Sequence, residues 1–254
     1  MVRMLSKRKR PSREVETLKE QLKVAEGTID DRTIMRLSKL MTKGVISKLD
    51  FLIAKGKEAD VYVADSGPSV DGDFVVLKVF RVETTNFFNR SDYMAGDERF
   101  PALKKNIYWI VNQWCKKEYG NLKLAQEAGV HAPKPYAFNG NVLAMEFIGN
   151  DTYAKQLKFE KLQNPEEVLK TIVADVKKLY SVGVVHCDLS EYNILVKDGV
   201  PYMIDFGQAV LHHPRSEFFL KRDLDNISSF FNKNYGMSVK SDDLYNFVTA
   251  QPQA

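Results

Sequence analysis

The chain has 254 residues, 44% hydrophobic and 28% charged, which is typical of a globular protein with a sizeable core, and its length predicts one domain or two tightly joined lobes. No apolar stretch is long enough to cross a bilayer, and none follows the basic N-terminus, so neither a membrane span nor a secretory signal is expected. The formal net charge of +4 is modest, and two cysteines without metal-ligand spacing, Cys115 and Cys187, argue against a disulfide framework and favour a cytoplasmic location.

The N-terminal end is strongly basic. Residues 1–13 carry six basic residues and no acidic one. Such a run gains affinity for RNA by releasing condensed counterions from the phosphates, and it can equally serve only to keep the chain in solution. Both interpretations stay open, and we assign residues 1–30 to a basic tail with a lead-in helix.

A docking helix and a pair of strands are predicted next. Residues 31–43 place Ile34 and Leu37 on one apolar stripe, and Gly44 is positioned to end the helix. Residues 56–64 and 73–80 have the composition of strands, and the segment between them is rich in glycine, proline and aspartate, which favour a turn. A strand hairpin near the start of the chain is therefore expected.

Two further hairpins are predicted from tight-turn dipeptides. One turns at Asn139–Gly140, because both residues accept the positive φ that a tight hairpin turn needs, and the other turns at Asp198–Gly199.

A well-defined helix is predicted over residues 164–183, where apolar residues recur at helical spacing. Asn164 is the expected N-cap, Pro165 lies in the first turn, and Glu167 completes a capping box. Gly183 ends the helix, which delivers the chain directly into a polar loop.

A second helix, over residues 106–128, carries a carboxylate in an unusual place. Glu118 lies on its apolar stripe, and a buried charge is costly unless it meets an opposite one. Lys78 is the candidate partner, because both faces of its strand are apolar. The alternative is that Glu118 bends to solvent beside Lys116 or Lys117 and that Lys78 extends past a sheet edge.

The stretch HCDLSEYNIL, residues 186–195, sets Asp188 and Asn193 five positions apart in one loop, and IDFG follows at 204–207. With the strand lysine and the helix glutamate, these motifs occur in the order of a protein kinase, and the chain resembles the protein-kinase-like fold. Phosphoryl transfer needs charge neutralisation and alignment of the acceptor, with little covalent work from the protein.

The resemblance implies a role for each motif. Lys78 would grip the α- and β-phosphates of ATP while Glu118 holds it, and Asp188 would accept the proton of the acceptor. Asn193 and Asp205 offer hard oxygen ligands for Mg²⁺, with Mn²⁺ as an alternative. His186 is interpreted as structural, supporting the loop. The expected nucleotide contacts lie in the first strand turn and in the segment that joins the lobes: Lys55, Gly56, Lys57, Glu58, Val61, Met145, Glu146 and Ile148.

The departures from ordinary protein kinases are also informative. Cys187 stands where those enzymes often carry an arginine that pairs with a phosphorylated activation loop, and no A-P-E segment follows Asp205. Lys78 and Glu118 are separated by 40 residues, which predicts an insert at about 84–105. The GKEADVY loop, the insert before KKEYGNL, HCDLSEYNIL and IDFGQAV together resemble the RIO family of atypical serine kinases, over about residues 31–235.

The expected fold class is therefore α+β. It is a two-lobed kinase-like fold with an extra N-terminal helix and a truncated C-terminal lobe without activation loop or peptide-binding helices. We expect an N-terminal lobe over 31–145 and a catalytic lobe over 146–254, in the branch of the family without a winged helix. The resemblance implies an autophosphorylating serine/threonine-type protein kinase or ATPase, with partners in the maturing small ribosomal subunit and its RNA. The alternatives are a small-molecule phosphotransferase of the aminoglycoside or choline type and an ATP-gated ribosome-assembly factor.

Overall fold

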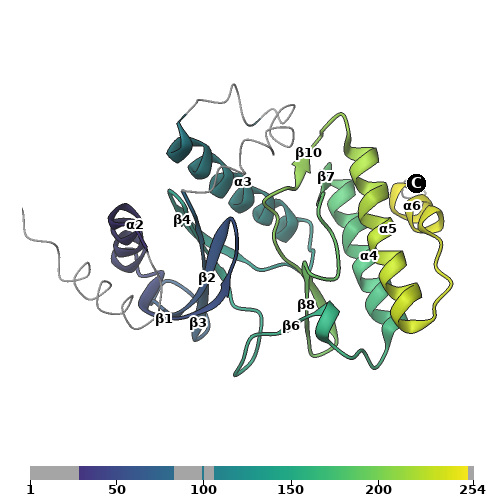
Figure 1. The fold of residues 1–254 in the computed structure, drawn as a ribbon, viewed down its shortest axis with the longest axis horizontal. Helices are drawn as coiled ribbons and strands as arrows, with labels where there is room; N and C mark the ends of the chain where they lie inside the picture. The colour runs from purple at the N-terminus through teal and green to yellow at the C-terminus, as the bar shows by residue number, and fades with distance from the viewer. Residues whose placement is uncertain (1–28, 83–98, 100–105, 251–254) are drawn as a thin grey trace, which may run out of the picture.

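The computed structural model describes residues 29–82, 99 and 106–250, and it places them in a sheet-rich lobe and a helical lobe (Figure 1). The basic tail, the predicted lead-in helix up to residue 28 and nearly all of the 84–105 insert lie outside the described residues. The helices are α2 Asp31–Thr42, α3 Ile107–Glu127, the 3-10 turn η2 Leu157–Phe159, α4 Pro165–Ser181, α5 Ser216–Tyr235 and α6 Ser241–Thr249. The strands are β1 Ile46–Lys55, β2 Ala59–Ser66, β3 Phe74–Phe80, β4 Pro135–Asn139, β5 Val142–Glu146, β6 Lys155–Gln156, β7 Val184–Val185, β8 Ile194–Lys197, β9 Val200–Met203 and β10 Val210–Leu211.

The first lobe is a five-stranded antiparallel sheet in the order β1-β2-β3-β5-β4. Successive side chains of a strand point to opposite faces, so β3 contributes to two separate cores. Val75, Leu77 and Val79 pack beneath α2, whereas Phe80 belongs to the main core that α3 and the second lobe share. This explains why every residue of β3 after Phe74 is buried.

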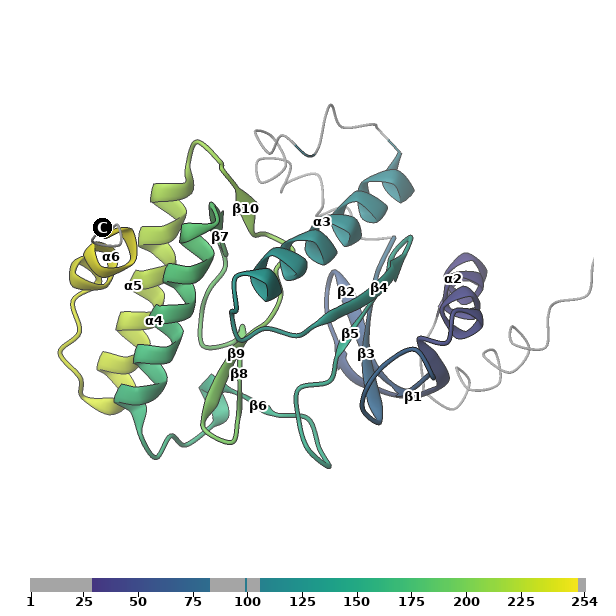
Figure 2. The same ribbon diagram turned by 180° about the vertical axis from the view of Figure 1, so that it is seen from behind.

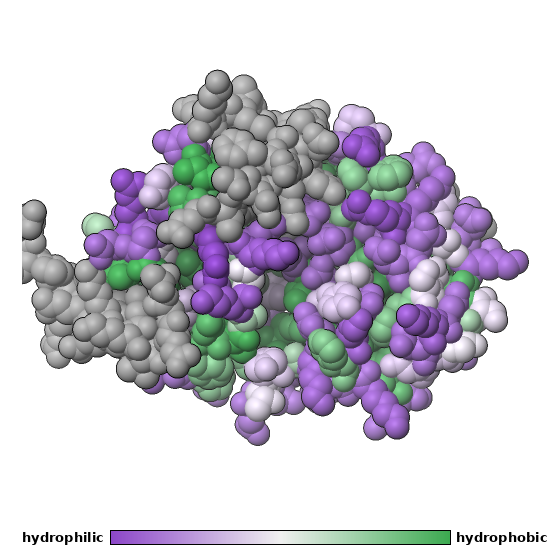
Figure 3. All heavy atoms as spheres, viewed as in Figure 1, coloured by the Kyte–Doolittle hydropathy of each residue, from purple (hydrophilic) through white to green (hydrophobic). Residues whose placement is uncertain are grey.

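Helix α3 lies between the sheet and the helical lobe (Figures 1 and 2). The helical lobe is formed by α4, α5 and α6, with two small sheets, β10-β7 and β6-β8-β9, on the side that faces the first lobe. On the face shown in Figure 3, hydrophobic residues gather between the two lobes on a surface that is otherwise largely hydrophilic. None of the helices in the described part of the chain is long and apolar enough to span a membrane.

The predicted α+β, kinase-like fold is confirmed, with α5 beginning only eleven residues after Asp205. The helices predicted over 31–43, 106–128 and 164–183 are present as α2, α3 and α4. The predicted turn at Asp198–Gly199 is also confirmed, because both residues adopt positive φ values, 51° and 79°.

Three local predictions need correction. Strand β1 was not expected, because its apolar and polar residues do not alternate strictly. In the structure, three register irregularities interrupt its pairing with β2. The turn between β4 and β5 lies at Gly140–Asn141, since Asn139 still pairs with Val142 and only Gly140 has a positive φ. The side chain of Asn164 makes no capping hydrogen bond, so the predicted capping box is wrong, although α4 does begin at Pro165.

Candidate active site

The predicted partner of Glu118 is Lys78, and the structure joins them directly. The Lys78 ammonium lies 2.8 Å from both carboxylate oxygens of Glu118 and 2.9 Å from Oδ1 of Asp205. Glu118 is completely buried, whereas the Asp205 side chain is 45% exposed. One cation therefore ties β3, α3 and the loop after β9 together, and one of its two carboxylates remains open at the surface.

Burial and charge compete in this cluster. Burial alone would lower the pKa of Lys78, but the charges of Asp205 and Glu118 outweigh it and raise the pKa above its usual range. Partial desolvation would raise the pKa of Asp205, yet the Lys78 ammonium holds this pKa below its ordinary value. At neutral pH Lys78 is therefore a cation, as an anionic ligand requires, and Asp205 is an ionised carboxylate, as a metal ion requires.

Asp188 and Asn193 lie in one loop, as their spacing predicts. The Asn193 amide nitrogen donates to the main-chain carbonyl of Asp188 at 2.8 Å and to its Oδ2 at 3.2 Å. Gln208 adds a second amide donor to the same Oδ2 at 3.0 Å. The carboxylate of Asp188 is thus oriented from two sides, by its own loop and by the segment after IDFG.

Helix α5 holds the backbone of this loop by hydrogen bonds with side chains that the sequence analysis did not identify. The buried carboxylate of Asp223 accepts hydrogen bonds from the N–H groups of Cys187 at 2.8 Å and Leu189 at 3.0 Å, on either side of Asp188. Arg222 donates to the carbonyl of Cys187, which has a positive φ of 66°. A signal existed in the sequence, because Asp223 lies on the apolar stripe of α5 just as Glu118 lies on that of α3.

His186 has the structural place expected of it. Its Nε2 lies 3.0 Å from the carbonyl of Ile204 and its ring centroid is 4.8 Å from that of Phe206. Because a carbonyl only accepts, Nε2 carries the proton, and the buried Nδ1 has no partner among the described residues. Burial lowers the pKa of His186 to about 4, so the ring is neutral at physiological pH.

This burial predicts an acid-dependent loss of stability. Between pH 6.5 and about 4 the unfolded chain takes up a proton at His186 that the folded chain does not, so the free energy of unfolding falls as the pH falls through this window. The contribution is on the order of 3 kcal/mol. We expect His186→Phe to lack this part of the pH dependence in urea unfolding at pH 7 and pH 4.5. An identical pH dependence in both proteins would contradict the prediction.

The predicted nucleotide-binding residues lie on two segments. Val61 pairs with Lys78 across β2 and β3, and Met145 pairs with Val76 across β3 and β5, so both share the sheet face of Lys78. Glu146 ends β5 on the opposite face, where its side chain accepts from the N–H of Lys134 at 3.0 Å. Ile148 is buried in the connection to the second lobe.

The conformation of the β1–β2 turn depends on Gly56. The N–H of Gly56 donates to the carbonyl of Ala59 at 3.0 Å, and a Cβ at Gly56 would lie only 2.6 Å from that oxygen. Gly56 therefore shapes the turn, and its N–H is used within the turn. Its expected contact with the nucleotide stays a prediction. Lys57 and Glu58 complete the turn between the strands.

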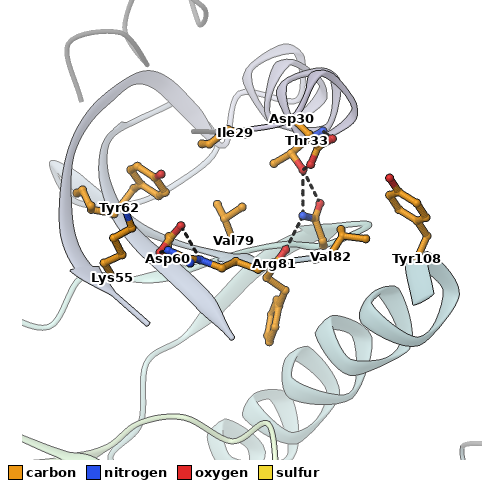
Figure 4. A pocket seen from close by; sticks show the side chains of 13 residues that line it. Ile29, Asp30, Thr33, Lys55, Asp60, Tyr62, Val79, Arg81, Val82 and Tyr108 are labelled. Carbon is orange, nitrogen blue, oxygen red and sulfur yellow. Dashed lines mark hydrogen bonds and ion pairs between the residues drawn. The ribbon is translucent and has the colours of Figure 1, made fainter. Parts of the chain in front are cut away.

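Lys55 lines a cavity that is separate from the Lys78, Glu118 and Asp205 cluster. A cavity of about 450 Å³ lies on the α2 side of the sheet, bordered by Tyr62, the Asp60–Arg81 ion pair and Tyr108 (Figure 4). Tyr62 follows Val61 along β2 and therefore lies on the sheet face opposite Lys78. The structure does not bring Lys55 into contact with the cluster of Lys78, Glu118 and Asp205.

A five-stranded lobe, a helical lobe and a lysine, glutamate and aspartate cluster at their junction define the protein-kinase-like fold. A family model described as RIO domain matches residues 60–244. The chain is 39% identical over 232 residues to the RIO-type serine/threonine-protein kinase Rio1 of Haloferax volcanii, and 38% identical over 235 residues to that of Methanocaldococcus jannaschii; each alignment covers 91% of this chain and 79% of the relative. The chain belongs to the RIO family and is an ATP-dependent protein kinase of the RIO type.

The solved structures show the same fold at greater distance. The Rio2 kinase of Chaetomium thermophilum, solved as an ADP/Mg²⁺-phosphoaspartate complex, superimposes with a TM-score of 0.65 at 21% identity, over 86% of this chain and 67% of that one. A second structure of the same kinase gives 0.66.

Proposed function

We propose that the chain transfers the γ-phosphoryl group of ATP, chiefly onto itself, with Lys78, Asp188 and Asp205 as the principal catalytic residues. The observation that carries the proposal is the three-way contact of Lys78 with Glu118 and Asp205 beside the oriented carboxylate of Asp188. Glu118 fixes the lysine so that its charge can meet the phosphates of the nucleotide. Asp188, whose carboxylate is oriented by Asn193 and Gln208, would accept the proton of an attacking hydroxyl.

The donor set fits Mg²⁺. Asn193 and Asp205 supply an amide and a carboxylate oxygen, and the carboxylate is both ionised and partly exposed. Mg²⁺ takes one or two such ligands and completes its shell with water and phosphate oxygens, so a dedicated cage of protein ligands is not required. Accordingly, the described residues contain no group of three or more histidine, cysteine, aspartate or glutamate side chains arranged for a metal. When bound, the ion would neutralise charge on the phosphates.

Self-modification is favoured over phosphorylation of free peptides, because the short segment between β10 and α5 leaves little surface on which a peptide could lie. Incubation with γ-labelled ATP and Mg²⁺ should label the chain itself and should label general kinase substrate peptides poorly. The same assay should measure ATP consumption with and without pre-ribosomal particles. Efficient labelling of peptides would contradict the self-modifying proposal, and strong labelling of aminoglycosides or choline would favour the small-molecule alternative.

The cellular setting that we propose is the maturation of the small ribosomal subunit, as the family resemblance implies. There, slow ATP turnover would act as a switch that releases the protein from an assembling particle. The six basic residues of the first thirteen would add contacts to phosphates of ribosomal RNA.

Removing residues 1–13 tests this RNA contact. We expect weaker binding to small-subunit ribosomal RNA and a flatter dependence of the logarithm of affinity on the logarithm of salt, because fewer counterions are released. ATP affinity should change little. Binding measured over a salt series for the full and shortened chains decides the matter, and an unchanged slope would mean that the basic end only keeps the chain in solution.

A further inference from the structure

Two further polar side chains of α3 are buried on the side that faces the Asp205 loop. Lys117 is 1% exposed and Asn121 is completely buried. The Lys117 ammonium donates to the carbonyls of Gly207 at 3.0 Å and Ala209 at 2.5 Å. The Asn121 amide nitrogen donates to the carbonyls of Phe206 at 2.9 Å and Ala209 at 2.8 Å. Four hydrogen bonds thus run from the helix that carries Glu118 to the backbone that directly follows Asp205.

This backbone adopts a conformation that needs support. Asp205 has a positive φ of 63°, and a non-glycine residue keeps such a strained conformation only where the surrounding contacts offset its cost. The loop also packs closely on α3. A Cβ at Gly207 would lie 3.1 Å from the Trp114 indole nitrogen and 3.3 Å from a Glu118 oxygen.

Asn121 satisfies only one of its two polar side-chain atoms among the described residues. Its Oδ1 is buried with no hydrogen-bond partner in the described part of the chain, and a buried acceptor without a partner lowers the stability of the fold. The two carbonyls that it binds have other donors, because Ala209 N–H reaches Phe206 and Lys117 reaches Ala209. The unpaired Oδ1 therefore offsets part of what the two hydrogen bonds of Asn121 contribute to stability, and stability alone is a weak reason for an asparagine at this position.

We propose that Lys117 and Asn121 are positioning residues that lock the Asp205 loop to α3, so that Asp205 and the Lys78–Glu118 pair keep one fixed geometry. The proposal rests on the assignment of Asp205 as the group that meets Mg²⁺ and the γ-phosphate. Both carboxylates that bind Lys78 then move as one body, and the enzyme needs no separate activation-loop event to bring them together.

Asn121→Leu is the central test, because leucine keeps the branched shape of the side chain and removes the amide group, and with it the two hydrogen bonds to the Asp205 loop and the unpaired Oδ1. Outer contacts that orient a metal-binding side chain are typically worth about 10- to 100-fold in metal affinity or activity. We expect the Mg²⁺ concentration that half-saturates autophosphorylation to rise by about tenfold or more and kcat to fall by a similar factor. ATP affinity measured in EDTA should stay within about twofold, because the altered contacts orient the metal-binding carboxylate and not the nucleotide site. Lys117→Met should act in the same direction.

Asn232→Leu is the matched control. Asn232 makes two backbone hydrogen bonds of 2.8 Å with Val239 beyond the end of α5, so its loss should lower thermal stability without raising the Mg²⁺ requirement. Should Asn121→Leu fail to fold, Asn121→Ala carries the same test. A normal Mg²⁺ requirement in folded Asn121→Leu and Lys117→Met, or a loss of activity that only follows thermal stability, overturns the proposal. Full activity of Asp205→Asn would instead overturn the proposed function.

Discussion

Asp188→Ala is expected to lower kcat for autophosphorylation by about a thousandfold, because it removes the carboxylate that we propose as the acceptor of the proton of the attacking hydroxyl. The fold should survive, since Asp223 and Asn226 hold the main chain of the loop independently of the Asp188 side chain. The affinity for ATP should remain within a few-fold of the original. Incorporation of γ-label in the presence of Mg²⁺, with nucleotide binding measured in parallel, checks both parts.

Glu191→Gln provides the matched control for this experiment. Glu191 is an acidic residue of the same loop, and its ion pair with Lys158 is long, at 3.9 Å. Its substitution should leave the rate nearly unchanged. Lys78→Ala should differ from both, since it removes the charge that we propose to meet the phosphates, and it should raise the KM for ATP as well as lower kcat. If purified Asp188→Ala retained most of its autophosphorylation, the role assigned to this loop would be wrong.

The cluster around Lys78 could be predicted because its residues violate the patterns of their own elements. Glu118 interrupts an apolar helix stripe, and Lys78 interrupts a strand that is apolar on both faces. A buried charge is costly unless it meets an opposite one, so each of these residues predicts a partner, and the pairing of Glu118 with Lys78 follows. Asp223 is an anomaly of the same kind in α5, but its partners are backbone N–H groups, which no side-chain pattern identifies.

Other features depend on contacts that a single element does not reveal. Lys117 follows Lys116 in the sequence, and nothing local distinguishes the buried lysine from its exposed neighbour. Its partners are carbonyls about ninety residues away, whose position is set by the whole fold. The turn at Gly140–Asn141 was misplaced by one residue for a similar reason. Asn141 is held by Thr33 of α2 and by the carbonyl of Phe80, so tertiary contacts decide the register of the hairpin.

A phosphorylated aspartate is the chemical outcome that would separate this enzyme from an ordinary protein kinase. The Lys78 ammonium holds the pKa of Asp205 low against the effect of partial desolvation, so the group is a carboxylate at neutral pH and can act as a nucleophile. In this alternative route a carboxylate oxygen of Asp205 would leave the metal ion and form a bond to the γ-phosphorus while the bond from that phosphorus to the bridging oxygen breaks, and ADP would leave with the electron pair. The product is an acyl phosphate on Asp205.

Hydroxylamine distinguishes this product, because it cleaves an acyl phosphate and leaves phosphoserine intact. After rapid acid quench of the chain labelled from γ-labelled ATP, we expect hydroxylamine to release a fraction of the label. That fraction should disappear in Asp205→Asn and persist in Asp225→Asn, which alters an exposed aspartate of α5 as a control. The Lys78 contact predicts one further feature. Lys78→Met removes the cation that holds Asp205 ionised and in place, so it should reduce the amount of hydroxylamine-labile label by about a hundredfold or more. Label that is entirely stable to hydroxylamine in the unsubstituted chain would exclude the aspartyl route and leave hydroxyl phosphorylation, with Asp188 as the base, as the chemistry of this site.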